Sequence, residues 1–312
     1  MSDTHSDGDM QQGSPLTPSG VSPEAWQHAA SSWQRRSGRV AGTLAVVGLV
    51  VVIAIVVAIV APKSSKPTTL PHAGPNPVQA VLTAAHRSAT INSLTATMTE
   101  HVSGNVTATT TGTIAVQRKP LLMWMKLTET IAGHTVPLSA ILTGQGMYMK
   151  LGSSLGLPST LSGKWLKISF GRLFGSSRVA SILRTLENEN PESQTQLLGG
   201  ITDARVVGGQ TVSGVSTTKY TGYLVPSAAL KYLPASLRPQ LAPIMKLISG
   251  KIDISVWIDA QQRIRQLSEI EHVSGNTVAA EFTYSGFNKP VHIALPPASQ
   301  VQSLTSMLAG KG

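Results

Sequence analysis

The chain contains no cysteine among its 312 residues. A disulfide framework, a thiolate nucleophile, a zinc–thiolate site and a lipid-modified cysteine are therefore all excluded. Aromatic residues make up only 4% of the chain, and charged residues only 13%, about half the usual globular share. A fold without disulfides must be held together by its own core, and a chain of this length can bury one.

Acidic residues are scarce after residue 62. Residues 1–62 contain three basic and four acidic residues, whereas residues 63–312 carry 22 basic and 11 acidic residues, a net charge of +11. A basic surface outside a membrane suits anionic lipid headgroups or acidic wall polymers. The alternative is that the surplus lysine and arginine only keep the domain soluble.

One long apolar run is present, from Val40 to Ala61, with 22 residues and no charge. As a helix it would be about 33 Å long, enough to cross a hydrocarbon core of about 30 Å. Three arginines precede the run and two lysines follow it, which favours a cytoplasmic N-terminus. The length of the run and the residues before it argue against a cleaved signal peptide. We therefore expect a single-pass plasma-membrane protein with an extracytoplasmic C-terminal domain.

Composition divides the rest of the chain. Residues 1–39 are polar and aperiodic, so we expect a disordered cytoplasmic tail before the transmembrane helix at 40–61. Residues 62–77 contain five prolines and form a semi-stiff linker that keeps the next domain close to the membrane. The ectodomain is expected at 78–302, followed by a C-terminal tail at 303–312.

The ectodomain begins with helical spacing over 78–92, and a period of two follows. We expect about ten strands, within 94–102, 106–116, 121–130, 136–142, 146–151, 165–170, 204–207, 215–225, 252–258, 263–273 and 278–284. Further helical pieces are expected at 179–186, 191–198 and, in two parts, 226–249. The predicted fold class is α+β, a curved antiparallel half-barrel sheet whose concave face is covered by helices.

Six residues occur twice in the same order: Glu100 to Asn105 and Glu271 to Asn276 both read Glu-His-Val-Ser-Gly-Asn. Both copies fall at predicted hairpin tips. A duplicated half or an independent use of the same turn chemistry would each explain the repeat. In both copies the adjacent Glu and His are expected to point to opposite faces of a strand.

Methionines gather on the predicted inner face of the sheet, where their flexible side chains would tolerate varied apolar ligands. A plain gap-filling core is the alternative interpretation. The residues predicted to line an apolar lipid-binding cavity are Leu94, Met98, Met123, Met125, Met147, Met149, Leu166, Ile254, Val256 and Phe282.

The C-terminal part carries motifs in a fixed order: Trp257-Ile258-Asp259, then Arg263-Ile264-Arg265, then Pro290-Val291-His292-Ile293 leading to Pro296-Pro297. Together they resemble the actinobacterial LppX/LprG-type lipoproteins, which have the LolA-like half-barrel fold. The resemblance covers about residues 78–302. It implies a cavity that holds acylated lipid and a role in lipid handling or transport at the cell envelope.

Two departures from that family stand out. Its members carry a lipobox cysteine, whereas this chain has a predicted transmembrane helix, so local extraction or presentation of a lipid is expected rather than long-range shuttling. The turn Asp259–Gln262 also lacks the usual glycine.

No GxSxG elbow, HExxH motif, P-loop or dinucleotide fingerprint is present, so we expect no enzyme, no cofactor and no metal. The expected partners are an acylated, anionic lipid or glycolipid and the membrane, with no nucleic acid; no protein partner is indicated. An envelope-sensing regulatory protein that uses its cytoplasmic tail is the alternative function, and a structural wall-associated domain is a third.

Overall fold

The computed structural model describes residues 76–88, 90–131, 133–143, 146–152, 163–169, 200–232, 238, 242 and 245–303. The predicted tail, transmembrane helix and nearly all of the linker lie outside these residues, as do the helical pieces predicted at 179–198 and the C-terminal tail from residue 304. Among the described residues, every helix is too short or too polar to span a bilayer.

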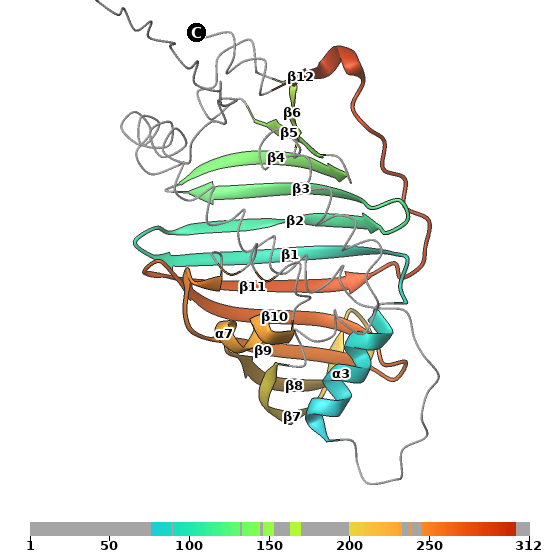
Figure 1. Ribbon diagram of the computed structural model, residues 1–312. Coiled ribbons are helices and arrows are strands. Elements are labelled where there is room, and N and C mark those ends of the chain that lie inside the picture. Colours follow the sequence, from blue (N-terminus) through green and yellow to red (C-terminus); the bar gives the residue numbers. More distant parts are fainter. Residues whose placement is uncertain are drawn as a thin grey trace, which may run out of the picture. The chain divides into compact units, whose positions relative to one another are not determined.

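The described residues form one sheet of twelve strands in the order β12-β6-β5-β4-β3-β2-β1-β11-β10-β9-β8-β7 (Figure 1). Neighbouring strands are antiparallel except β12, which pairs with β6 in parallel. The sheet is open, with β12 and β7 at its edges. The strands are β1 (Ser93–Gly104), β2 (Ala108–Gln117), β3 (Leu122–Ile131), β4 (His134–Thr143), β5 (Gly146–Leu151), β6 (Trp165–Ser169), β7 (Ile201–Val212), β8 (Val215–Leu224), β9 (Ile248–Asp259), β10 (Ile264–Val273), β11 (Asn276–Ser285) and β12 (Val301–Ser303).

The curved, open and mostly antiparallel sheet agrees with the predicted half-barrel, but the expected number of strands, about ten, was too low. The helices of the described residues are few and pack only near the β7–β10 end, so the predicted helical cover of the concave face stays a prediction. The strand that the sequence did not indicate is β12, which has three residues after the short helix η3 (Ala298–Gln300). Three residues are too few to show a period of two. β7 is also much longer than the predicted 204–207. The prediction missed most of this edge strand because its residues are largely exposed and show no alternation of apolar and polar side chains.

Two helices of the described residues pack on the β7–β10 end of the sheet (Figure 1). The helix α3 (Pro77–Ser88) packs against β7, β9 and β10, and α7 (Pro226–Tyr232) packs against β9. Proline suits the first position of α3 because the amide that it lacks has no partner there. The Asn76 side chain accepts a hydrogen bond from the Val78 amide at 3.1 Å and caps the helix.

The two Glu-His-Val-Ser-Gly-Asn copies lie side by side at neighbouring hairpin tips, which confirms their predicted location. Gly104 at the end of β1 pairs with Asn276 at the start of β11. The Asn276 side chain accepts a hydrogen bond from the Val106 amide at 3.0 Å. A Cβ atom on Gly104 would come within 2.7 Å of the Gly275 carbonyl oxygen, and Gly104 has a φ of +130°. The close approach of the two tips therefore requires glycine at this position.

We predict that Gly104→Ala lowers the free energy of unfolding by about 2–4 kcal/mol, since it adds a backbone clash to the conformational strain. Gly133→Ala is the matched control, because Gly133 also has a positive φ of +82° but faces open space. Its cost should be only about 1 kcal/mol. Urea unfolding of both variants measures the difference, and equal losses would contradict the proposed clash.

Candidate functional site

Strand register places all ten predicted cavity residues on one face of the sheet, here named the apolar face. Directly opposed residues of paired strands share a face. Met98 is opposite Phe282, Phe282 is opposite Leu267, and Leu267 is opposite Val256. Two further rows connect the remaining predicted residues: Leu94, Val116, Met123, Leu142 and Met147, and Ile114, Met125, Ala140, Met149 and Leu166. Ile254 lies two residues before Val256 and so on the same side.

Eight of these ten side chains are buried, and the exceptions Met147 and Met149 are half-buried on β5. The opposite side of β1 carries Thr95, Thr97 and Thr99, and we name it the threonine face. The apolar face is thus buried over much of the sheet. That it encloses a lipid-sized cavity stays a prediction.

Four glutamates, none of which is among the predicted site residues, are also buried on the apolar face. Glu100 on β1 is opposite Thr110 on β2, which is opposite Glu129 on β3. In the other direction Glu100 is opposite Ala280 on β11, which is opposite Glu269 on β10. These five residues form a line across the sheet, and Glu271 lies two residues beyond Glu269. We name the four glutamates and Thr110 the carboxyl row.

The carboxyl row could have been found from the strand pattern. Glu100 lies between Met98 and Val102 on the apolar parity of β1, where a solvent-facing residue is not expected. The repeated motif supplies both Glu100 and Glu271. His101 and His272, the neighbours of these glutamates, are exposed, which confirms that Glu and His point to opposite faces in each copy.

Burial governs the charge state of the row. It raises the pKa of Glu100 to about 8, with further contributions from the charges of Glu129 and Glu271. Burial likewise raises the pKa of Glu269 to about 8 and of Glu271 to about 7, and it raises that of Glu129. Glu100 and Glu269 are therefore mainly protonated near neutral pH, and Glu271 is then about half ionised.

Several polar atoms of this region have no hydrogen-bond partner within the part of the chain that the structure describes. They are both carboxyl oxygens of Glu100 and Glu271, one oxygen of Glu129 and one of Glu269, and the hydroxyls of Thr110 and Tyr284. The ion pairs of the described residues involve Asp203 and Asp259 and none of the four glutamates. Buried polar groups normally have partners, so this concentration of unpaired atoms calls for an explanation.

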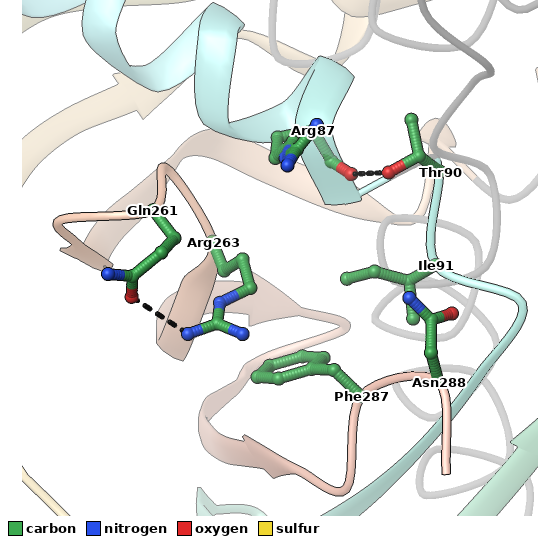
Figure 2. Close-up of a pocket in the computed structure, with 7 residues that line it drawn as sticks. All are labelled: Arg87, Thr90, Ile91, Gln261, Arg263, Phe287 and Asn288. Carbon is green, nitrogen blue, oxygen red and sulfur yellow. Dashed lines mark hydrogen bonds between the residues drawn. The ribbon is translucent and has the colours of Figure 1, made fainter. Parts of the chain in front are cut away.

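A separate pocket of about 210 Å³ lies where the end of α3, the β9–β10 turn and the loop after β11 meet (Figure 2). The volume of this pocket is smaller than the roughly 300–1,000 Å³ that is typical of sites for drug-sized ligands. None of the ten predicted cavity residues lines it. The residues around it are Arg87, Thr90, Ile91, Gln261, Arg263, Phe287 and Asn288.

Asp259, from the motif that carries the family resemblance, organises the turn beside this pocket. Its carboxylate accepts hydrogen bonds from the amides of Gln261 and Arg263, each at 2.9 Å. It also accepts from Arg263 Nε at 2.9 Å and Arg265 Nε at 2.6 Å. Burial alone would raise the pKa of Asp259, but these hydrogen bonds outweigh it and hold that pKa below its ordinary value.

Both arginines of the motif also lie over the ring of Phe287, at 5.4 and 4.9 Å from its centre. In the turn Asp259–Gln262, which contains no glycine, Gln262 adopts the left-handed conformation with a φ of +59°. The motif is therefore accounted for by turn structure, because its charges are engaged within the protein.

Comparison with known proteins gives structural similarities only. No protein-family model matches the sequence, and no curated protein sequence matches it. The lipoprotein LppX of Mycobacterium tuberculosis is similar, with 21% identity, coverage of 71% of this chain and 100% of that chain, and a TM-score of 0.42. LprF of Mycobacterium bovis has 12% identity, coverage of 71% and 97%, and a TM-score of 0.44.

A domain from Vibrio parahaemolyticus, described as belonging to an outer-membrane lipoprotein-sorting protein, has 10% identity, coverage of 70% and 95%, and a TM-score of 0.24. LppX is one of the two proteins after which the resembled family is named.

The carboxyl row predicts that stability falls as pH rises. An unfolded glutamate titrates near pH 4.5, whereas Glu100 and Glu269 titrate at about 8 in the folded chain. Stability is therefore fully present below about pH 4.5 and is lost as pH rises through 8, by about 1.4 kcal/mol per unit of pKa difference for each group. Urea unfolding between pH 5 and 9 measures the slope. Glu100→Gln should flatten it, and the exposed Glu281→Gln should not.

We further predict that Asp259→Asn lowers the free energy of unfolding by about 2–4 kcal/mol, because two arginines lose a buried charged acceptor. Asp203→Asn is the control, since the Asp203–Arg205 pair, at 2.6 Å, is exposed. Such pairs contribute about 0–1 kcal/mol. Thermal unfolding of both variants distinguishes them, and a neutral Asp259→Asn would contradict the structural role.

Proposed function

We propose that this chain is a membrane-anchored, extracytoplasmic protein that binds the acyl chains of a lipid on the apolar face of its sheet. The observation that carries the proposal is the register, which gathers all ten predicted cavity residues on one side of an open sheet. An open sheet keeps its two faces separate, so one side can hold an apolar ligand while the other meets water. The family resemblance of the C-terminal motifs points to the same ligand class.

The proposed role is lipid handling at the cell envelope rather than catalysis. The tether at 62–77 and the predicted span at 40–61 would keep the domain beside its own membrane, where it could extract or present a lipid. A headgroup that is anionic would lie toward the basic exterior, because the apolar face carries carboxyls that disfavour a negative charge. In this arrangement the acyl chains occupy the apolar rows on either side of the carboxyl row.

The test is to identify the lipid that remains on the full chain after purification in detergent. We expect mass spectrometry of an organic extract to find acylated lipid in a fixed ratio to protein. Ala140→Phe, which adds a ring on the apolar face between Met125 and Met149, should lower that ratio severalfold. Ser139→Phe adds the same ring to the threonine face and is the matched control.

Equal lipid content in both variants, or no acylated lipid on a folded chain, would overturn the proposal. Deletion of residues 2–34 addresses the regulatory alternative. Lost cellular function with lipid content unchanged would favour an envelope sensor that signals through its N-terminal tail.

A further inference from the structure

The carboxyl row is a polar line within an apolar face. Neighbouring strands are about 4.8 Å apart, so the row extends about 19 Å from Glu129 to Glu269. Apolar side chains flank it on both sides along β1, with Met98 before Glu100 and Val102 after it. A ligand whose chains lie on the apolar face would therefore place a polar group against this line.

Two hydroxyls give independent support for a polar ligand group here. Thr110 is 1% exposed and lies between Glu100 and Glu129, yet its hydroxyl has no partner among the described residues. The Tyr284 hydroxyl is also unpaired, and the charge of Glu269 acts on it electrostatically. Leaving a buried donor or acceptor unpaired is costly, so an incoming group that pairs several of these atoms gains that energy.

The ion pairs found among the described residues supply no cation to this row. His86 and Arg87 on α3, and Lys231 on α7, are exposed, although these helices pack on the sheet. The described residues also contain no group of three or more acidic or histidine side chains that could hold a metal ion. The spread of the carboxyls along a line explains this, because a metal needs ligands that converge on one point.

We infer that the carboxyl row is a subsite for a positively charged, hydrogen-bond-donating group, such as the primary ammonium of an amphiphile whose chain lies on the apolar face. This inference rests on the proposed lipid-binding function and names the polar chemistry of its ligand. An ammonium offers three donors and one positive charge to a region with unpaired acceptors. An anionic group would be repelled by any ionised glutamate of the row, and it could bind only while the other carboxyls stayed protonated.

Binding of the ammonium to a protonated glutamate displaces the carboxyl proton. The ammonium enters with its charge, since its pKa is about 10. One protonated glutamate of the row releases its proton to the solvent and becomes the carboxylate that pairs with the ammonium. No bond other than this O–H bond is broken, and the charge of the site is unchanged. A neutral hydroxyl group entering the same place would release no proton.

The test uses the full chain in phosphatidylcholine nanodiscs, with empty nanodiscs as the partition background. Three probes share one chain length: dodecylamine, dodecanol and dodecanoate. At pH 7 we expect dodecylamine to bind about tenfold more tightly than dodecanol, the advantage of a charge-assisted hydrogen bond, and dodecanoate to bind most weakly. Calorimetry in two buffers of different ionisation enthalpy should show proton release when dodecylamine binds, up to one proton per molecule, and none when dodecanol binds.

Glu100→Gln keeps the shape of the protonated side chain and should remove most of the preference for dodecylamine. Glu281→Gln makes the same change on the threonine face, opposite Thr99 and Ser268, and should leave the preference intact. Unfolding curves establish that both variants are folded. Equal effects of the two substitutions, or dodecanol binding as tightly as dodecylamine without proton release, would overturn the inference.

The failure of this inference is distinguishable from failure of the proposed function. If acylated lipid co-purifies with the chain but the three probes bind alike, the subsite is wrong and the lipid-binding function stands. If no acylated lipid and no probe binds to the folded chain, both are overturned.

Discussion

The pairing register of one long antiparallel sheet is the constraint on which the rest of the structure depends. Successive side chains of a strand point to opposite faces, and directly opposed residues share a face. Once β1 pairs with β11, residues from opposite ends of the domain become neighbours. Met98 and Phe282 meet on the apolar face by the same register that sets Thr97 opposite Thr283 on the other. A slip of one residue would exchange the two faces.

The glycine-containing hairpin tips fix that register. The two copies of the repeated motif interlock, because Gly104 lies against the backbone of Gly275 and Asn276 binds the Val106 amide. At the other end of the sheet, Asp259 holds the β9–β10 turn through two backbone amides and two arginines. The repeated motif and the Asp259 motif are therefore accounted for by the turns that they form. The polar feature without a structural explanation is the carboxyl row on the buried apolar face.

The carboxyl row conflicts with the usual content of a protein interior. Burial raises the pKa values of the four glutamates on the apolar face. Among the described residues, several of their oxygens have no hydrogen-bond partner and none of the four forms an ion pair. Unpaired polar groups buried on an apolar face lower the stability of the fold. Binding of a ligand that forms hydrogen bonds with them would explain why they are present. The basic exterior and the acidic interior would then recognise different parts of one amphiphilic ligand.

The sequence by itself determined the strand alternation, the first helix, the hairpin tips and the face on which Met98 and Glu100 lie, because each follows from local periodicity or turn chemistry. It did not determine β12, whose three residues pair with β6 from far along the chain. Nor did it show that Glu100, Glu129 and Glu269 fall in one line, since local periodicity gives the face of each strand but not its partner or its register. Only the pairing of distant strands brings those carboxyls together.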